Sequence, residues 1–517
     1  RSNFPHNAGD KSIGRNGNVA SADLPIPNDP DKWWISSIGD TASATNGGSQ
    51  YRKFTMSYLF RALYNYNRRY LVNFSFRRDG ASVFKYTGNT WDNFYSVGAG
   101  WIMSEENFMR NQHVIDYLKI KGSYGVLGNQ NVGTEGGNYP AFPTLNSSNA
   151  IFGDNIISSY AQAYLATNLR WEKTKAWEVG FEMQMFNQRL HIEPTYYSKK
   201  TEDLICYLES FMGAQDGLIN SGSIRNRGFE LSGSWSDTIG DDFRYTVSGN
   251  LTTIDNEVLT LGKTYYQGDK SVAVSEPGKP IGYFYGYEVE GIYQNKADIA
   301  SSPENTLAAV APGDLKFRDL DGNNVISIGK NTVDDPGDRE IIGNSQPRYH
   351  YGATLALQWA GIDFSIFFQG IGRQDWYPAA NALAFWGPYA RPYATYLPKN
   401  FHTQIWSEEN PNSYFPRPRG YTALQGTNRE LTAVNDRYLQ NIGYCRLKNL
   451  TVGYTLPRQW TRKALIESLR IYFTGENLFT WSGIRSDYID PEMAATNGNL
   501  RLYPWQRTYM FGVDVTF

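Results

Sequence analysis

The chain has 517 residues, with 49 Lys and Arg balanced by 51 Asp and Glu, a formal net charge of -2 and a pI of about 6.3. This balance implies no general affinity for polyanions, so we expect no nucleic-acid partner. Aromatic residues make up 15% of the chain, which fits either the core of a large soluble β protein or the aromatic girdles of a membrane β-barrel.

The predicted elements are strands rather than membrane helices. The longest apolar candidate, residues 350–370, is interrupted by Gln358, Asp363 and Gln369, and no stretch approaches the roughly 18 to 20 apolar residues of a spanning helix. Apolar and polar residues instead alternate with period two from residue 51 onward. Clear examples are residues 70–77, 118–126, 229–235, 349–359, 469–479 and 507–517. We count about thirteen such segments, each near the roughly 9 to 11 residues that a tilted strand needs to cross a bilayer.

The connections between these segments alternate in length. Short links are predicted around residues 65–67, 104–114, 187–188, 237–242, 360–361 and 457–468. Long links are predicted around residues 79–90, 128–168, 205–223, 257–346, 371–442 and 480–508. Outer-membrane barrels have short periplasmic turns and long extracellular loops, whereas a soluble sandwich has no reason for this rhythm. The alternation therefore predicts an all-β, transmembrane antiparallel β-barrel with every long loop outside.

The predicted division is an extracellular loop segment at residues 1–50 and a portion of a barrel at residues 51–517, with 257–346 and 371–442 as its longest extracellular loops. The last strand places Tyr509, Phe511 and Phe517 on one face, as expected of a strand that closes a barrel by pairing with the first. Single-chain bacterial barrels usually have an even number of strands. The odd count leaves two interpretations, a miscount by one or the C-terminal part of a longer barrel.

One long loop contains alternating oxygen-bearing residues that resemble the spacing of a calcium loop. The predicted ligands of a structural Ca²⁺ or similar hard cation are Asp319, Asp321, Asn323, the backbone carbonyl of Val325, and Asp335. The loop departs from the EF-hand pattern, because Asn324 replaces the turn glycine and Lys330 the final glutamate. The alternative is a turn stabilised by hydrogen bonds between side chains and backbone. No cofactor is otherwise expected.

The loop at residues 371–442 is rich in aromatic residues. The candidates for substrate binding are Trp376, Tyr377, Phe385, Trp386, Tyr389 and Tyr393. Aromatic rings stack on sugar rings or peptide side chains, and they also serve protein interfaces. The alternative is that these rings pack the loop against its neighbours.

No set of catalytic residues is recognisable. The five histidines are scattered, and the chain has no GxSxG, no HExxH and no P-loop spacing. We therefore predict that the protein is not an enzyme.

Several blocks resemble the C-terminal half of SusC-like TonB-dependent transporters, in the same order along the chain. The blocks are YNYNRRYLVNFSFRRDGASVF (64–84), WDNFYSVGAGWIMSEENFM (91–109), IDYLKIKGSYGVLGNQNVG (115–133), PGKPIGYFYGYEVEGIYQ (277–294), GDLKFRDLDGNNVI (313–326), IIGNSQPRYHYG (341–352), YCRLKNLTVGYTLP (444–457), IYFTGENLFTWSG (471–483) and the tail from YPWQRTYMF onward. The resemblance implies the last thirteen or so strands of a barrel of about 22 strands, in the outer membrane of a Gram-negative, Bacteroides-type bacterium.

The resemblance also implies partners and a function. The partners are an N-terminal plug and barrel part of the same transporter, TonB acting through that part, a SusD-like surface lipoprotein as a lid, outer-membrane lipid and, as one assembly, a dimer of such pairs. The implied function is the uptake of a large nutrient, either a glycan or a peptide. The alternatives are a structural or adhesion barrel that displays its long loops, a passive porin with an open lumen and, more remotely, a soluble β-rich lectin.

Overall fold

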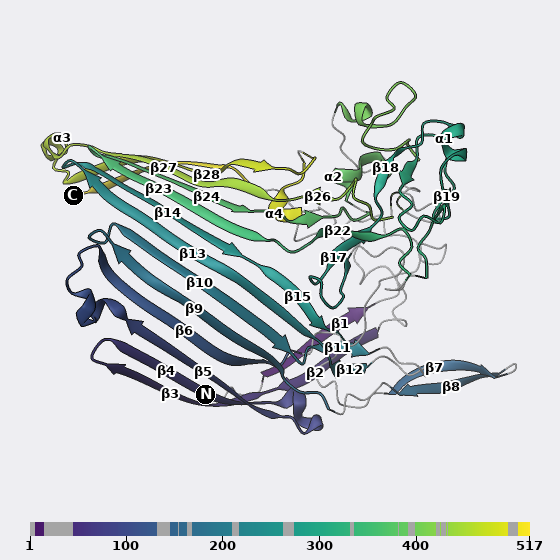
Figure 1. The fold of residues 1–517 in the computed structure, drawn as a ribbon, viewed down its shortest axis with the longest axis horizontal. Helices are drawn as coiled ribbons and strands as arrows, with labels where there is room; N and C mark the ends of the chain where they lie inside the picture. The colour runs from purple at the N-terminus through teal and green to yellow at the C-terminus, as the bar shows by residue number, and fades with distance from the viewer. Residues whose placement is uncertain are drawn as a thin grey trace, which may run out of the picture.

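A single curved sheet of antiparallel strands dominates the computed structural model (Figure 1). The structure describes residues 6–14, 45–131, 145–152, 155–162, 168–208, 217–261, 273–330, 335–380, 382–390, 399–419, 424, 431, 433–486, 488–494 and 505–517. The strands of the sheet are β3 (Thr55–Tyr66), β4 (Tyr70–Ala81), β5 (Trp91–Ile102), β6 (Ile115–Asn129), β9 (Glu172–Met185), β10 (Leu190–Glu202), β13 (Ser223–Ile239), β14 (Phe243–Thr253), β23 (Tyr349–Trp359), β24 (Ile362–Ile371), β27 (Tyr444–Thr455), β28 (Ser468–Ser482) and β29 (Thr508–Thr516).

The order of the strands in the sheet follows their order in the chain. Thirteen strands run from β3 at one edge to β29 at the other, each antiparallel to its neighbours, and the short β15 (Asp255–Thr260) also pairs with β13. The predicted antiparallel β fold and the count of about thirteen strands are therefore confirmed.

The connections follow the predicted rhythm with one exception, since residues 82–90 form a shorter connection than residues 103–114 or 456–467. The short ones are residues 67–69, 103–114, 186–189, 240–242, 360–361 and 456–467, and the long ones are residues 82–90, 130–171, 203–222, 254–348, 372–443 and 483–507. The short turns and the long loops lie at opposite ends of the sheet (Figure 1).

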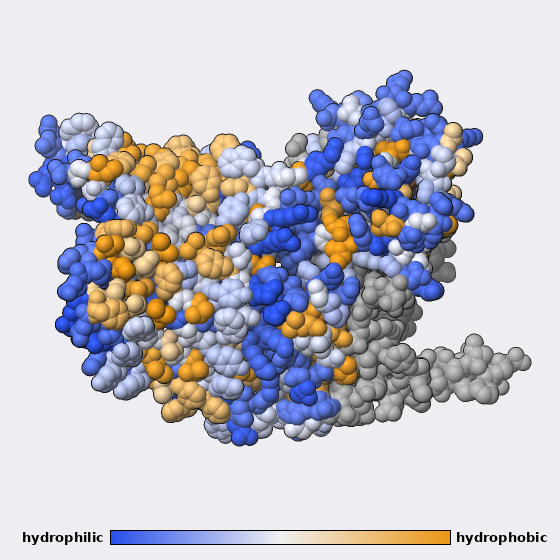
Figure 2. All heavy atoms as spheres, viewed as in Figure 1, coloured by the Kyte–Doolittle hydropathy of each residue, from blue (hydrophilic) through white to orange (hydrophobic). Residues whose placement is uncertain are grey.

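The two faces of the sheet differ in polarity because the side-chain period of a strand is two. On one face, here called the apolar face, Trp177 of β9 lies against Tyr196 of β10, with ring centroids 5.6 Å apart. On the opposite, polar face of β9 lie Glu178 and Glu182. Figure 2 shows apolar residues gathered over the strands and a hydrophilic band between them and the long-loop end.

Smaller elements occupy the long-loop end. The paired strands are β1 (His6–Gly14) with β2 (Thr45–Lys53), β7 (Leu145–Phe152) with β8 (Asn155–Gln162), β11 (Ile205–Leu208) with β12 (Gly217–Asn220), β17 (Tyr283–Gly286) with β16 (Ala273–Val274) and β22 (Glu340–Asn344), β18 (Val289–Ile292) with β20 (Leu315–Phe317), β19 (Glu304–Asn305) with β21 (Val325–Ile326), and β25 (Asp375–Trp376) with β26 (Gln440–Asn441). The division predicted between residues 50 and 51 falls inside β2.

The α-helices are short. They are α1 (Lys296–Ala300), α2 (Leu383–Trp386), α3 (Arg458–Thr461) and α4 (Pro491–Ala494). Among the described residues, no helix combines the length and apolar character needed to span a membrane.

Candidate functional site

The two longest loops fold together around one aromatic core. Trp386 is fully buried, and its ring centroid lies 4.9 Å from that of Phe385 and 5.1 Å from that of Tyr438. Phe415 stacks on Tyr438 with centroids 5.7 Å apart. The cluster continues into the loop at residues 254–348 through Phe284, Tyr287, Leu315 and Phe317.

The aromatic residues predicted to bind substrate lie in this core. Trp376, Tyr377, Phe385, Trp386 and Tyr389 are all buried, and Tyr393 lies outside the described residues. The described rings pack the loops against each other, which is the alternative that the sequence left open. Their faces are covered by protein in this structure, so direct contact with a ligand would require the cluster to open.

A buried ion cluster joins the same two loops. The fully buried carboxylate of Asp314 accepts hydrogen bonds from Arg417 Nε at 2.7 Å and Arg417 Nη2 at 3.2 Å, and it also contacts the guanidinium of Arg419. A backbone hydrogen bond also connects the two loops, since the N–H of Tyr287 donates to the carbonyl of Val434 at 2.8 Å. Buried charges are tolerated when they are paired and hydrogen-bonded. The two longest loops therefore form one packed body.

Burial also changes the acidity of tyrosines in this body. Burial raises the pKa of Tyr414 to about 12, although a hydrogen bond with Gln440 and the nearby Arg485 and Arg437 lower it. The guanidinium carbon of Arg485 lies 3.6 Å from the centroid of the Tyr414 ring. Tyr414 therefore remains neutral and acts as a packing and hydrogen-bonding group.

The predicted cation loop is held by its own hydrogen bonds. Asp319 Oδ1 accepts from the N–H of Gly322 at 2.7 Å, and its Oδ2 accepts from the N–H of Asn324 at 2.8 Å. Asn323 Oδ1 accepts from the N–H of Val325 at 2.7 Å, and Asp321 Oδ1 accepts from the N–H of Asn323 at 3.0 Å. These bonds match the turn that was the alternative. Cation binding stays a prediction.

The acidic residues near this loop differ from the set predicted. Oxygens of Asp319, Asp321 and Asp338 lie within 4.8 Å of one another, whereas Asp335 pairs with Lys330 at 3.6 Å. Asp338 is buried, and burial raises its pKa despite hydrogen bonds from the N–H groups of Ser327 and Leu320. Asp338 was not among the predicted ligands, because its approach to Asp319 and Asp321 depends on the fold of the whole loop.

The polar face of the sheet carries a chain of opposite charges. Lys119 Nζ and Lys121 Nζ lie 3.4 and 3.3 Å from carboxylate oxygens of Glu182, and Lys121 also contacts Glu193. A hollow of about 410 Å³ beside them is lined by Leu63, Leu71, Asn73, Gly98, Lys119 and Lys121, among others. Polar side chains thus cover β6, β9 and β10 on the face opposite the aromatic rings.

A second buried arginine anchors the last long loop over the polar face of β27. Arg446 is fully buried and donates to Asp490 at 2.6 Å, to Glu492 at 2.8 Å and to Thr480 Oγ1 at 2.9 Å. Lys448 Nζ adds a contact to Glu492 at 3.0 Å. Sequence reasoning did not single out this cluster.

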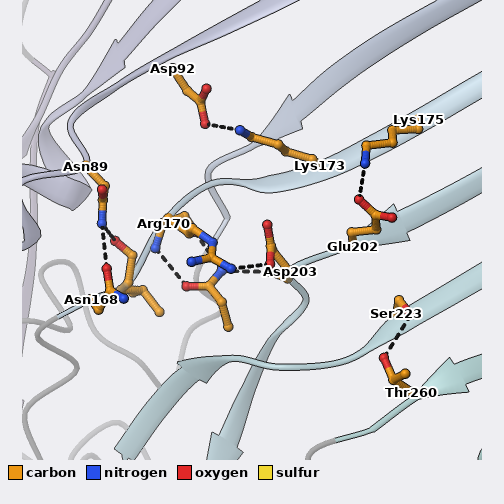
Figure 3. Close-up of polar contacts among 12 residues, drawn as sticks. Asn89, Asp92, Asn168, Arg170, Lys173, Lys175, Glu202, Asp203, Ser223 and Thr260 are labelled. Atoms are coloured by element: carbon orange, nitrogen blue, oxygen red, sulfur yellow. Dashed lines mark hydrogen bonds and ion pairs between the residues drawn. The ribbon is translucent and has the colours of Figure 1, made fainter.

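Ion pairs also connect the strands at the long-loop end of the sheet (Figure 3). Lys173 pairs with Asp92 at 2.8 Å, Lys175 with Glu202 at 2.5 Å, and Arg170 with Asp203 at 2.6 Å. Ser223 and Thr260 share a hydrogen bond of 2.8 Å between their hydroxyl groups, which joins β13 to β15. These polar contacts tie neighbouring strands together where the sheet meets its loops.

Comparison with known proteins finds relatives along most of the chain. Residues 4–478 match the family described as "TonB dependent receptor-like, beta-barrel". The chain is 29% identical to TonB-dependent receptor P3 of Formosa agariphila over 486 residues, which cover 88% of this chain and 45% of that protein. It is 27% identical to TonB-dependent receptor SusC of Bacteroides thetaiotaomicron over 479 residues, covering 90% of this chain and 44% of that protein.

A solved structure shares the fold. The RagAB peptide importer in its "open-open" state superposes with a TM-score of 0.72 at 22% identity, covering 95% of this chain and 50% of that one. The chain therefore spans about half the length of the relatives it matches.

Proposed function

Because the chain belongs to the TonB-dependent receptor β-barrel family, we propose that its sheet forms part of the wall of an active outer-membrane importer. The observation that carries this proposal is the division of the sheet into an apolar and a polar face, with the packed body of the two longest loops at one end. The apolar face suits lipid, the polar face suits a hydrated or protein-filled interior, and the long loops then lie outside the cell.

We further propose a SusC-like mode of action. The similarity to SusC supports a surface lipoprotein of the SusD type as a lid, and energy transfer from TonB through a plug that belongs to the same transporter. The plug and the remaining strands would meet the open edges of β3 and β29. Pairs of this kind would assemble as dimers in the outer membrane.

The imported nutrient is proposed to be large, either a glycan or a peptide. A likeness to a peptide importer at 22% identity supports the fold and does not choose between these classes. The packed outer loops suit a transporter that closes over its cargo, because a rigid surface is available for a lid to seat on. Residues of the polar face, rather than the buried aromatic cluster, would meet the nutrient.

The test is purification of the intact transporter from outer membranes, followed by mass spectrometry of everything that elutes with this chain. We expect a plug-bearing polypeptide and a SusD-like lipoprotein. Uptake of fluorescent oligosaccharides or peptides by cells should then stop when a protonophore removes the proton-motive force. Finding the chain alone, together with steady ion conductance in planar bilayers, would instead establish a passive porin. Finding it alone without conductance would favour an adhesion or structural barrel.

A further inference from the structure

A row of three cationic side chains crosses the apolar face near its long-loop end. The strand register places Lys200 of β10 directly opposite Lys175 of β9 and directly opposite Arg225 of β13. Adjacent strands lie about 4.8 Å apart, and like charges directly opposite one another destabilise a sheet. Lys175, Lys200 and Arg225, here called the basic row, therefore concentrate positive charge at one level of the wall.

The carboxylates beside the basic row neutralise only part of its charge. The carboxylate of Glu202 forms ion pairs with Lys175 Nζ at 2.5 Å and with Lys200 Nζ at 2.8 Å, while Arg225 pairs with Glu257. Two carboxylates thus serve three cations, whose side chains remain 44%, 42% and 34% exposed. The flanking cations Lys173 and Arg227 are paired one to one with Asp92 and Asp255. The basic row is left with a positive charge that an external anion can reach.

The basic row lies just beyond the aromatic edge of the apolar face. Trp177, Tyr196 and Phe229 occupy the same face of the same three strands and are exposed. Lys175 is two residues beyond Trp177, and Lys200 is four beyond Tyr196, so the charges lie roughly 7 to 14 Å further along the strands. Aromatic rings of a membrane barrel mark the interface with lipid. Lipid headgroups occupy the next layer, where Lys and Arg extend their charged ends.

We propose that the basic row binds the phosphate of a glycolipid headgroup in the outer leaflet of the outer membrane. The hydrophilic band that Figure 2 shows beside the apolar residues is the surface on which this headgroup would rest. Ammonium and guanidinium groups bind phosphate through charge-assisted hydrogen bonds. The inference depends on the long loops facing outward and is independent of which nutrient is imported.

The experiment uses the intact transporter, stripped of lipid in detergent and titrated with monophosphoryl lipid A by native mass spectrometry. The test variant is Lys175→Gln/Lys200→Gln. The matched control is Arg458→Gln/Lys463→Gln, which removes the same number of positive charges from the short connection that contains α3, at the opposite end of the sheet. Each cation near an anionic membrane surface is worth about 1 kcal/mol. We therefore expect the test variant to bind roughly 10- to 30-fold more weakly, and the control to bind like the unmodified protein.

Glu202→Gln separates lipid binding from a merely structural network of ion pairs. Removing this carboxylate breaks the same ion pairs but adds net positive charge, so we expect equal or tighter binding of monophosphoryl lipid A. If Glu202→Gln and the double lysine variant weaken binding alike, the basic row serves only the sheet and the proposal is wrong. Binding of phosphatidylethanolamine as tight as that of the phosphorylated glycolipid would also overturn it. Where the double variant fails to keep the heat-modified gel mobility of a folded barrel, Lys200→Gln alone is the test variant, and we expect it to bind roughly 5-fold more weakly.

Discussion

The guanidinium of Arg470 on β28 and the carboxylate of Asp363 on β24 form a two-pronged ion pair that passes over the strand between them. Nη2 lies 2.6 Å from Oδ2, and Nε lies 2.9 Å from Oδ1. The intervening strand β27 contributes Gly453 at this point, where an added Cβ would lie 2.4 Å from Asp363 Oδ1. Arg470 also reaches Asp514 of the last strand at 3.1 Å. One side chain therefore connects three strands at the short-turn end of the polar face.

Gly453→Ala is expected to lower the stability of the barrel by about 1.5 to 3 kcal/mol, the range for a hydrogen bond to a charged group. The added methyl group would push Asp363 away from Arg470, because neither the backbone of β27 nor the paired strands can withdraw. The measurement is the temperature at which heat-modified gel mobility is lost. Gly122→Ala is the control, since the nearest atom to its added Cβ is at 3.5 Å. Equal melting temperatures for the two variants would show that the ion pair adds no stability.

Arg446→Leu is expected to release the loop at residues 483–507 from the wall. The substitution leaves Asp490 and Glu492 without their main cation, and breaking a buried ion pair costs about 3 to 5 kcal/mol. The two acids are partly exposed, so the lower end of that range is expected. Limited proteolysis of the folded barrel should show new cleavage in this loop. Arg458→Leu, at an exposed ion pair with Glu467, should cleave like the unmodified protein, and an uncut loop in Arg446→Leu would refute the anchor.

The strands and the rhythm of loops were predictable from sequence because both depend on local patterns. The alternation in residues 509–517 needs only the side-chain period of a strand, and the observed register confirms it by placing Phe511 opposite Phe473. Loop length likewise follows directly from the spacing between strands. Such patterns depend only on residues close together in the sequence, so they can be recognised without knowledge of tertiary contacts.

The contacts of the loops could not be predicted, because they join residues far apart in sequence. Asp314 meets Arg417 across 103 residues, and Arg446 meets Asp490 across 44. Loop segments lack the periodicity that would show which side chains are buried. The sequence was therefore equally compatible with Trp386 stacking on a ligand and with Trp386 packing against other loop residues. The basic row could not be recognised from sequence, since Lys175, Lys200 and Arg225 lie on three different strands and only the strand register places them side by side.

Trp386→Ala is expected to disrupt the packed body of outer loops rather than to remove a contact with nutrient. Replacing a fully buried Trp by Ala costs about 3 to 5 kcal/mol, through lost burial and the cavity left behind. Protease digestion should therefore cut residues 372–443 in intact cells, and association with the proposed SusD-like lid should weaken. Trp359→Ala, at an exposed position on the apolar face, is the control for loss of a Trp. A loop that stays resistant while nutrient binding falls would instead support the prediction of direct substrate contact.

Calcium is expected to protect the loop around Asp319, Asp321 and Asp338. Burial raises the pKa of Asp338, so its contribution to stability is full below the ordinary pKa of Asp and is lost as the pH rises through the raised value. A bound cation would offset that loss, because Ca²⁺ is held by carboxylate oxygens. Hydrogen exchange at the N–H groups of Leu320 and Ser327, which donate to Asp338, should slow when Ca²⁺ is added at pH 7 and should not respond at pH 4. Asp321→Asn should abolish the response and Asp335→Asn should retain it. Exchange that is identical with Ca²⁺ and with a chelator would identify the loop as a turn held by its own hydrogen bonds.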